Sequence, residues 1–189
     1  MPTWVYVFLI LAGVLFALKL MYVLAAGWAL PVTCGALFVS TSRAKIRVFL
    51  DAVPMNREDL LVDLGCGDGR VLRAACKRYG ARALGFEVNP LAYLMARVLS
   101  LGIQRLRIER DSFWSRDLGG ADVVFCYLFP DVMERLARKM ERELRSGTRV
   151  VSCNFPVPGW RARQVLSSDS SRHRAPIYVY RFPDNEISS

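Results

Sequence analysis

Histidine and paired cysteines are almost absent from this chain of 189 residues. It contains one histidine and five cysteines, and no two cysteines form a C-x-x-C pair. Zinc sites and disulfide frameworks need such ligands in sets, so neither is indicated, and we interpret the cysteines as reduced structural thiols. The histidine, His173, lies in a polar run and is interpreted as a loop residue rather than a general base. We therefore expect no metal site.

Acidic residues are in the minority. The chain has 17 Asp and Glu against 26 Lys and Arg, a net charge of +9. This balance suits an anionic membrane surface, an acidic protein face or nucleic acid equally, so charge alone does not identify the partner. A hydrophobic content of 53% argues against disorder, and the length allows one α/β domain with a modest appendage.

Charge is nearly missing from residues 4–28, where Lys19 is the one charged side chain. As a helix this stretch would reach about 36 Å, enough to cross a hydrocarbon core of roughly 30 Å. Trp4 and Trp28 bracket it as interfacial aromatic residues would. We predict a single transmembrane helix. A buried core helix and a secretory signal peptide are the alternatives, and no basic residue precedes the run as a signal peptide requires.

The basic residues that flank the predicted span are all on one side of it. None lies before it, whereas Arg43, Lys45 and Arg47 follow within about 20 residues, which by the positive-inside rule places the remainder of the chain in the cytoplasm. An Arg- and Ser-rich amphipathic leader is missing, which favours a bacterial inner membrane over an organelle membrane.

From residue 60 onward, short apolar runs alternate with helical stretches, the pattern of a parallel sheet covered by helices. We divide the chain into an anchor at 1–28, a connector at 29–59, a catalytic domain at 60–183 and a flexible tail at 184–189. Strands are predicted at 60–64, 83–87, 106–109, 123–127, 148–153 and 177–182.

Helices are predicted between these strands and in the connector, at 42–50. One runs through 71–79 and ends at Gly80, and Asn89-Pro90 opens the next. The clearest spans 131–144, with a capping-box-like start at Asp131 and an end at Gly147. Its charged face is predicted to be solvated: Arg135, Arg138, Lys139 and Arg142.

The segment LVDLGCGDGR at 61–70 places glycines at 65, 67 and 69 directly after a buried strand. Glycines let the chain turn sharply and approach a ligand. The Gly-Lys-Ser/Thr of a P-loop and the G-x-G-x-x-G spacing of a dinucleotide loop are both missing. Asp63 and Asp68 would repel a pyrophosphate, so a cationic or zwitterionic ligand is favoured. Glu87, 24 residues after Asp63, stands where an acidic side chain accepts hydrogen bonds from a ribose.

Together, VDLGCGDGR and GFEVNP resemble the S-adenosylmethionine site of the seven-strand methyltransferases. The resemblance implies an α/β fold with a Rossmann-like seven-stranded sheet and helices on both faces, preceded here by the transmembrane helix. It implies that the Asp63 region holds the methionine moiety, Glu87 the ribose and Asp111 the adenine amine. The full set of cofactor-binding residues that it predicts is Asp63, Gly65, Cys66, Gly67, Asp68, Gly69, Glu87, Val88, Asn89, Asp111, Ser112 and Tyr127.

The fourth predicted strand ends in YLFP, at the sheet edge that faces the transferable methyl group. We assign Tyr127, Phe129 and Pro130 to the catalytic site, with ordinary core packing as the alternative for the two aromatic residues. The Asp/Asn/Ser-Pro-Pro-aromatic motif of nucleic-acid amino-methyltransferases is missing, which disfavours a nucleic-acid substrate. A dry aromatic channel suits an alkyl amine, because it disfavours the protonated form of a lysine.

A closer resemblance covers nearly the whole chain. The apolar segment, the connector GALFVSTSRAKIRVFL and the segment MERELRSGTRVVSCNFPVPGW are similar to the small membrane-anchored protein-lysine methyltransferases whose mitochondrial members modify the ADP/ATP carrier and the ATP synthase c-subunit. This implies a membrane-embedded protein acceptor with a target lysine. It also implies that residues 38–40 reach the site and that Asn154, Phe155, Pro156 and Trp160 follow the fifth strand at the same rim. A lipid or other small amphiphile as acceptor, and a non-catalytic cofactor-binding protein, are the alternatives.

Overall fold

The computed structural model describes residues 2–29, 41–167 and 175–183. The chain divides into two compact units, Met1–Leu37 and Phe38–Ser189. The predicted roles of residues 38–40, of His173 and of the tail at 184–189 lie outside the described residues.

The first unit contains one helix, α1 (Thr3–Ala29). Its apolar span, Thr3–Leu24, has a mean hydropathy of 2.5, and none of it is buried against other parts of the chain. The helical prediction for residues 4–28 is therefore confirmed. A long apolar helix near an N-terminus has the length and composition to cross a bilayer, properties that it shares with signal sequences and core helices.

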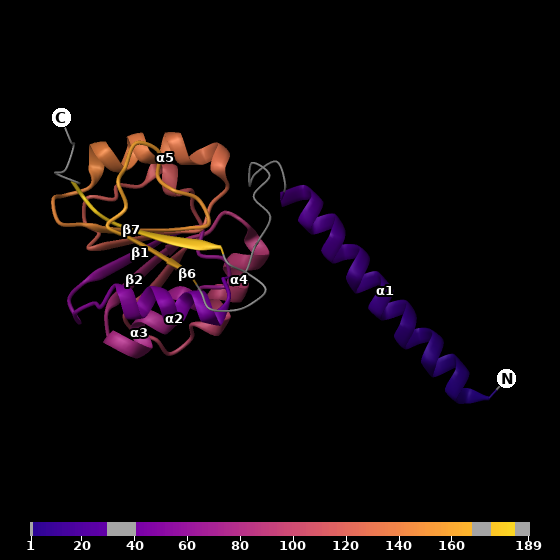
Figure 1. Ribbon diagram of the computed structural model, residues 1–189. Coiled ribbons are helices and arrows are strands. Elements are labelled where there is room, and N and C mark those ends of the chain that lie inside the picture. The colour runs from indigo at the N-terminus through magenta and orange to yellow at the C-terminus, as the bar shows by residue number, and fades with distance from the viewer. Residues whose placement is uncertain (1, 30–40, 168–174, 184–189) are drawn as a thin grey trace. The chain divides into compact units, whose positions relative to one another are not determined.

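The second unit alternates strands and helices (Figure 1). Its elements, in chain order, are α2 (Arg43–Ala52), β1 (Leu60–Leu64), α3 (Arg70–Tyr79), β2 (Arg82–Phe86), α4 (Pro90–Leu99), β3 (Leu106–Glu109), the short 3-10 helix η1 (Phe113–Ser115), β4 (Val123–Cys126), α5 (Pro130–Glu143), β5 (Arg149–Cys153), β6 (Gln164–Ser167) and β7 (Pro176–Arg181).

The strands form one seven-stranded sheet in the order β3-β2-β1-β4-β5-β7-β6. The first five strands are parallel to their neighbours, whereas β7 is antiparallel to β5 and β6 is antiparallel to β7. Six strands were predicted within two residues of their ends, and β6 was missed. This edge strand is short and mostly exposed, so it lacks the apolar signal that marks the buried strands.

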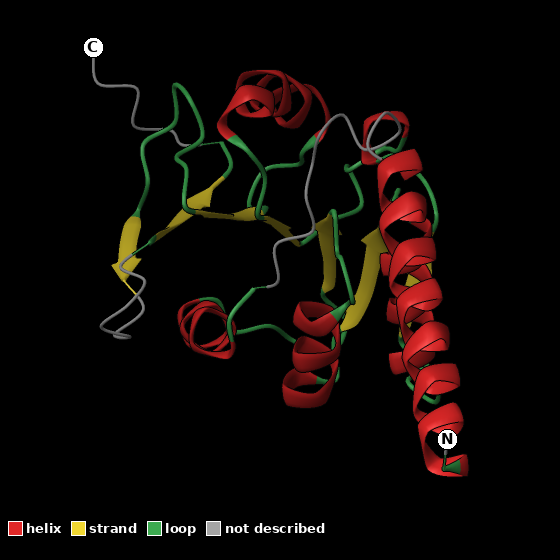
Figure 2. Ribbon diagram, turned by 90° about the vertical axis from the view of Figure 1, so that its right-hand side faces the viewer, coloured by secondary structure: helices red, strands yellow, loops and turns green. Residues whose placement is uncertain are grey.

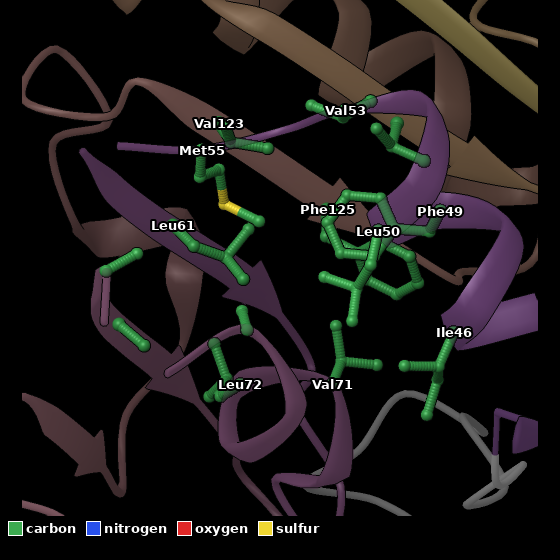
Figure 3. Packing of buried hydrophobic residues seen from close by; sticks show 14 of the residues in the cluster. Ile46, Phe49, Leu50, Val53, Met55, Leu61, Val71, Leu72, Val123 and Phe125 are labelled. Carbon is green, nitrogen blue, oxygen red and sulfur yellow. The ribbon is translucent and has the colours of Figure 1, made fainter. Parts of the chain in front are cut away.

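Helices cover both faces of the sheet, as predicted. Figure 2 shows α2 and α3 on one side of the strands and α5 on the other. On the first side, Phe49 of α2 and Leu72 of α3 pack against Leu61 and Phe125 of the sheet (Figure 3). The Phe49 and Phe125 rings lie 5.0 Å apart between centroids. The second layer packs Met133, Leu136 and Met140 of α5 against β1, β4 and β5. The connector thus contributes a core helix.

The ends of α5 differ from the prediction. Phe129 is the N-cap and Pro130 the first helical residue, so Asp131 lies in the first turn and does not cap the helix. The helix ends at Glu143, with Leu144 as C-cap, one residue before the predicted end at 144. Proline fits the first turn because its missing N–H would find no helical partner there.

The charged face of α5 is not wholly solvated. Lys139 is 5% exposed, and its Nζ donates to both carboxylate oxygens of Glu143 at 2.7 Å and to the Arg116 carbonyl at 2.7 Å. The prediction of a solvated Lys139 was therefore wrong. A long amphipathic side chain can bury its stem when carbonyl and carboxylate acceptors satisfy its ammonium group.

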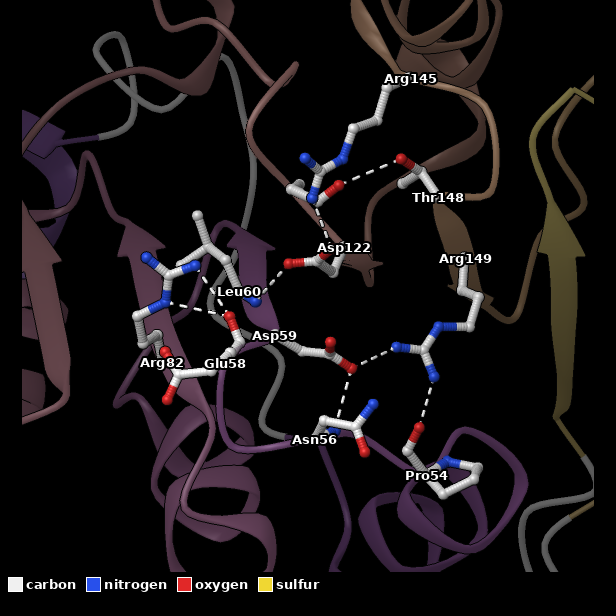
Figure 4. Close-up of polar contacts among 11 residues, drawn as sticks. Pro54, Asn56, Glu58, Asp59, Leu60, Arg82, Asp122, Arg145, Thr148 and Arg149 are labelled. Carbon is white, nitrogen blue, oxygen red and sulfur yellow. Dashed lines mark hydrogen bonds and ion pairs between the residues drawn. The ribbon is translucent and has the colours of Figure 1, made fainter.

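Polar contacts fasten the amino-terminal ends of the parallel strands (Figure 4). Asp122 accepts a hydrogen bond from Leu60 N–H at 2.8 Å and pairs with Arg145. Asp59 accepts from Arg149 Nη2 at 2.7 Å. These groups lie at the sheet edge opposite the carboxyl ends of the strands, so they stabilise the scaffold and leave the other edge for ligands.

Candidate active site

The glycine loop joins β1 to α3 and is fastened to the end of β2. The N–H groups of Gly65 and Cys66 both donate to the Phe86 carbonyl, at 3.0 and 2.9 Å. Gly65, Gly67 and Gly69 have φ values of 88°, 55° and 75°, a left-handed conformation that side chains rarely adopt. The loop therefore needs glycine at these positions, and it forms a bare backbone surface at the carboxyl edge of the sheet.

Two buried carboxylates stand at this edge. Asp63 in β1 is 3% exposed and Glu87, one residue beyond β2, is 8% exposed. Glu87 accepts hydrogen bonds from Gly67 N–H and Asn89 N–H, both at 2.8 Å, so it ties the glycine loop to the start of α4. Within the described part of the chain, no hydrogen-bond donor or cation partners the Asp63 carboxylate.

Burial has the largest effect on the pKa values of Asp63 and Glu87. It raises the pKa of Asp63 well above its ordinary value, and the negative charges of Glu87 and Asp68 raise it further. Burial also raises the pKa of Glu87, although the backbone hydrogen bonds oppose that effect. A cationic ligand group beside Asp63 would relieve the cost of burying its charge.

Asp68 is in a different situation. Arg70 forms a hydrogen-bonded ion pair with it. Arg70 Nε lies 3.0 Å from both carboxylate oxygens of Asp68, and Nη2 lies 2.8 Å from Oδ2. Burial alone would raise the pKa of Asp68, but the hydrogen bonds and charge of Arg70 lower it overall. Of the two carboxylates expected to face a positive ligand, Asp63 alone lacks an arginine partner.

A pocket of about 330 Å³ lies beside the glycine loop. Three arginines reach it, Arg43 from α2 and Arg70 and Arg73 from α3, and Asp68 also lines it. Arg70 Nη1 donates to the Thr41 carbonyl at 3.2 Å, which joins the loop to the segment before α2. The pocket can take an anionic group, such as the carboxylate of an amino acid.

The third strand of the site, β3, is followed by Asp111 and Ser112. Asp111 accepts from Ser112 N–H at 2.6 Å and from Arg116 Nε at 2.8 Å. These contacts, led by the Ser112 N–H, lower the pKa of Asp111. Ser112 caps η1. Asp111 thus follows Asp63 of β1 and Glu87 of β2 in the expected chain order, but its carboxylate is paired with Arg116.

Tyr127 immediately follows β4 and belongs to a hydrogen-bonded cluster with Asn154 and Lys45. Asn154 Nδ2 donates to Tyr127 Oη at 2.9 Å, and Lys45 Nζ donates to Asn154 Oδ1 at 2.5 Å. Lys45 Nζ also lies 4.7 Å from the centroid of the Tyr127 ring. Asn154 has a φ of 72°, uncommon for a residue with a side chain and frequent at functional sites.

The sequence reasoning missed Lys45, which it counted only as a basic residue after the membrane span. The side chain is 4% exposed. It precedes Phe49 by four residues, and residues at this spacing share one face of a helix. The buried face of α2 therefore carries Lys45 towards β4 and β5. Phe129, in contrast, is 40% exposed, and Pro130 begins α5, so the structure joins neither of them to this cluster.

The fold defines the class of protein. The sheet order, with a final antiparallel strand inserted next to the edge, is that of the S-adenosylmethionine-dependent methyltransferases. The chain is similar to the crystal structure of an RNA methyltransferase from Salinibacter ruber in complex with S-adenosyl-L-homocysteine, with a TM-score of 0.73 and 26% identity over 80% of this chain and 98% of that chain.

The family follows from the sequence. The model of the ANTKMT methyltransferase domain matches residues 63–164. A protein-lysine N-methyltransferase of Saccharolobus islandicus is 33% identical over 147 residues, which cover 76% of this chain and 91% of that protein. The human ATP synthase c-subunit lysine N-methyltransferase is 36% identical over 107 residues, 55% of this chain and 46% of that protein. The chain belongs to the ANTKMT methyltransferase family, and its cofactor is S-adenosylmethionine.

The match to the animal relatives is partial. A mouse adenine nucleotide translocase lysine N-methyltransferase is 34% identical over 119 residues, 61% of this chain and 52% of that protein. The chain thus spans about half the length of these relatives. The site fits the cofactor, because the buried carboxylates Asp63 and Glu87 and the bare backbone of the glycine loop suit a cationic nucleoside.

Proposed function

We propose that the protein transfers methyl groups from S-adenosylmethionine to lysine side chains of a membrane-associated protein. The observation that carries this proposal is the pair of buried carboxylates, Asp63 and Glu87, at the ends of neighbouring strands, with no cation beside Asp63 in the described residues. Family membership supports the reaction, and the lysine acceptors in the names of the relatives support the acceptor class.

Each group of cofactor-binding residues contacts a different part of the ligand. The Asp63 carboxylate accepts hydrogen bonds from the ammonium of the methionine moiety, and the backbone amides of residues 65–69 line that moiety. Glu87 keeps acceptor capacity for the ribose hydroxyls beyond its two backbone bonds. The turn at Val88 and Asn89 positions the Glu87 carboxylate. Asp111 and Ser112 bind the adenine. When bound, the cofactor supplies an electrophilic methyl group.

The acceptor lysine binds beside Tyr127, where the carboxyl end of β4 faces the methyl group. The Tyr127 ring and Asn154 hold the amine in line for attack, and Phe129 and Pro130 form the outer rim. A lysine must first lose its proton, which passes to water. Its nitrogen would then bond to the methyl carbon as the methyl–sulfur bond breaks and S-adenosyl-L-homocysteine leaves. The buried ammonium of Lys45, 4.7 Å from the Tyr127 ring centroid, disfavours a second positive charge there and so favours the neutral amine.

The apolar helix α1 anchors the enzyme, with a single pass at 1–28 and the connector at 29–59 leading to the catalytic domain at 60–183. Basic residues that follow the span favour a cytoplasmic catalytic domain, in a bacterial inner membrane or, as the alternative, an organelle membrane. This arrangement brings the site near lysines of membrane-embedded proteins.

RNA methylation is a second candidate. The similar protein from Salinibacter ruber is an RNA methyltransferase, and this likeness and the net charge of +9 favour RNA as the acceptor. This candidate predicts RNA binding that weakens steeply as salt concentration rises.

One experiment separates the acceptor classes. Membranes and RNA from cells without this gene are incubated with the full-length chain and radiolabelled cofactor, and protein, lipid and RNA are then fractionated. We expect the label in protein, as methyllysine after hydrolysis. Glu87→Ala should abolish the signal, whereas Glu134→Ala, at an exposed position of α5, should retain it. Label in the lipid or RNA fraction would contradict the protein acceptor.

A further inference from the structure

Helix α4 presents its large apolar side chains to solvent. Leu94, Met95 and Val98 are 58%, 49% and 56% exposed. The helix packs on the sheet through small residues instead, with Ala92 and Ala96 as its buried positions. We call the exposed group the α4 patch, which consists of Leu91, Leu94, Met95, Val98, Leu99 and Leu101.

Five of the six residues of the α4 patch form one helical stripe, and Leu101 lies just after the helix. Positions 91, 94, 95, 98 and 99 follow the i, i+3, i+4, i+7, i+8 spacing that places side chains on one face. In the described residues that follow α1, the exposed large hydrophobic side chains outside the patch are Phe129 and Val165. Exposed apolar residues that gather on one element in this way mark an interaction surface.

Basic residues lie beside the α4 patch. Residues 90–108 contain three arginines, Arg97, Arg105 and Arg107, and no acidic residue. The Arg97 guanidinium lies 6.0 Å from the centroid of the Tyr93 ring. The Arg107 side chain is 77% exposed and pairs with Glu109 at 2.9 Å, and Arg105 pairs with Glu58 at 3.3 Å. A helix with an apolar face and a basic margin has the composition of helices that lie in a bilayer interface with anionic headgroups.

The covalent connection limits how far the start of α2, and with it the second unit that carries the α4 patch, can be from a bilayer that holds α1. Residues 30–42 join the end of α1 to the start of α2. At roughly 3.3–3.6 Å per residue, this segment cannot extend beyond about 47 Å. Such a tether raises the effective concentration of the surface at the membrane, so a weak individual contact becomes populated.

We infer that the α4 patch inserts into the interface of the bilayer that α1 spans, as a second membrane contact. This inference rests on the proposed anchoring role of α1. Asn89 is the N-cap of α4, and its N–H donates to Glu87 at 2.8 Å, so the contact fixes the cofactor site directly against the membrane-facing helix. The enzyme then presents its acceptor site at the level of lysines near the headgroups.

The test uses the full-length protein reconstituted into vesicles of phosphatidylcholine and phosphatidylglycerol. In a background that carries Cys34→Ser and Cys76→Ser, an environment-sensitive fluorophore is attached to Leu94→Cys. A matched control carries it at Arg138→Cys, an exposed position on α5 across the sheet. Lipids with a nitroxide at a shallow acyl position serve as the quencher, and flotation of the vesicles reports anchoring by α1.

We expect the probe at 94 to lose more than half of its emission to the lipid quencher, while the probe at 138 keeps most of its emission. Protein that floats but shows equal, weak quenching at both positions would overturn the inference and leave the anchor intact. A probe at 94 that is shielded from aqueous iodide but not quenched by lipid would also overturn it, in favour of a protein partner or a second copy. Protein that does not float with the vesicles would instead refute the membrane anchor. It would then overturn both the proposed anchoring role of α1 and the inference on the α4 patch.

Discussion

At the scale of single residues, the Asp63 carboxylate is expected to strengthen cofactor binding and to lower the folding stability of the ligand-free protein. Its carboxylate is 3% exposed and lacks a cation partner among the described residues. An unpaired buried charge costs folding free energy, and a bound ammonium would return part of that cost as affinity. A residue selected only for stability would not be ionisable here, so Asp63 has the character of a ligand-binding group.

We expect Asp63→Asn to weaken S-adenosylmethionine binding by about tenfold or more, equivalent to ~1.4 kcal/mol, in titration calorimetry. The same change should raise the melting temperature of the ligand-free protein by ~2–4 °C for each kcal/mol of stability gained at neutral pH. Asp51→Asn, at an exposed position of α2, is the control and should alter neither value. Unchanged affinity in Asp63→Asn would remove Asp63 from the site.

The pH dependence of stability has a defined sign at this residue. Because burial raises the pKa of Asp63, the folded chain keeps its proton over a range in which the unfolded chain has lost it. The stability that this proton provides is complete below about pH 3.9 and is lost as pH rises through the elevated pKa. Asp63→Asn should therefore flatten this part of the stability profile, measured by denaturant unfolding at several pH values.

At the scale of elements, the close packing of β2 against the glycine loop and α3 sets the shape of the site. A Cβ atom on Gly85 would lie 2.5 Å from Leu72 Cδ1 and 2.7 Å from Cys66 Sγ. Cys66 is part of the loop, and burial raises its thiol pKa, so it serves as a small apolar side chain. The absence of a side chain at 85 allows the loop to sit on the end of β2.

Gly85→Ala should therefore destabilise the protein by about 1–3 kcal/mol, the typical cost of overpacking a core, and should also weaken cofactor binding because Cys66 must move. Thermal unfolding and calorimetry measure the two effects. Gly120→Ala is the matched control, because a Cβ there meets nothing within 4 Å and the residue has no left-handed φ. A stable Gly85→Ala protein with normal affinity would show that the loop is not held as described.

At the scale of the whole molecule, two units of opposite character share one chain. The apolar span has a mean hydropathy of 2.5 and no buried residues, whereas the second unit has two hydrophobic layers around a seven-stranded sheet. The first unit lacks internal packing partners and therefore suits a nonpolar solvent, while the second folds around its own core.

The flanking charges predict the orientation of the chain in the membrane. We expect an epitope tag placed before Met1 to be cleaved by protease added to intact bacterial spheroplasts, and a tag placed after Ser189 to be cleaved only after lysis. The reverse pattern would place the catalytic domain outside. Release of the protein from membranes by alkaline carbonate would refute the span itself.

The sequence by itself determined the fold class, the positions of six strands along the chain and the cofactor. Glycine spacing, apolar runs and the positions of Asp63 and Glu87 are local patterns, and parallel strands must bring their carboxyl ends to one edge. It failed where an element lacks a local signal, as at the exposed edge strand β6, or where capping alternatives compete, as at Asp131.

Only the tertiary structure decided which charges are paired and which are left for a ligand. In the structure Asp68 pairs with Arg70, and the buried Lys139 pairs with Glu143. Lys45 donates a hydrogen bond to Asn154, and the apolar stripe of α4 is exposed. Sequence cannot supply these results, because they depend on contacts between residues far apart in the chain and on burial, which a packed fold alone defines.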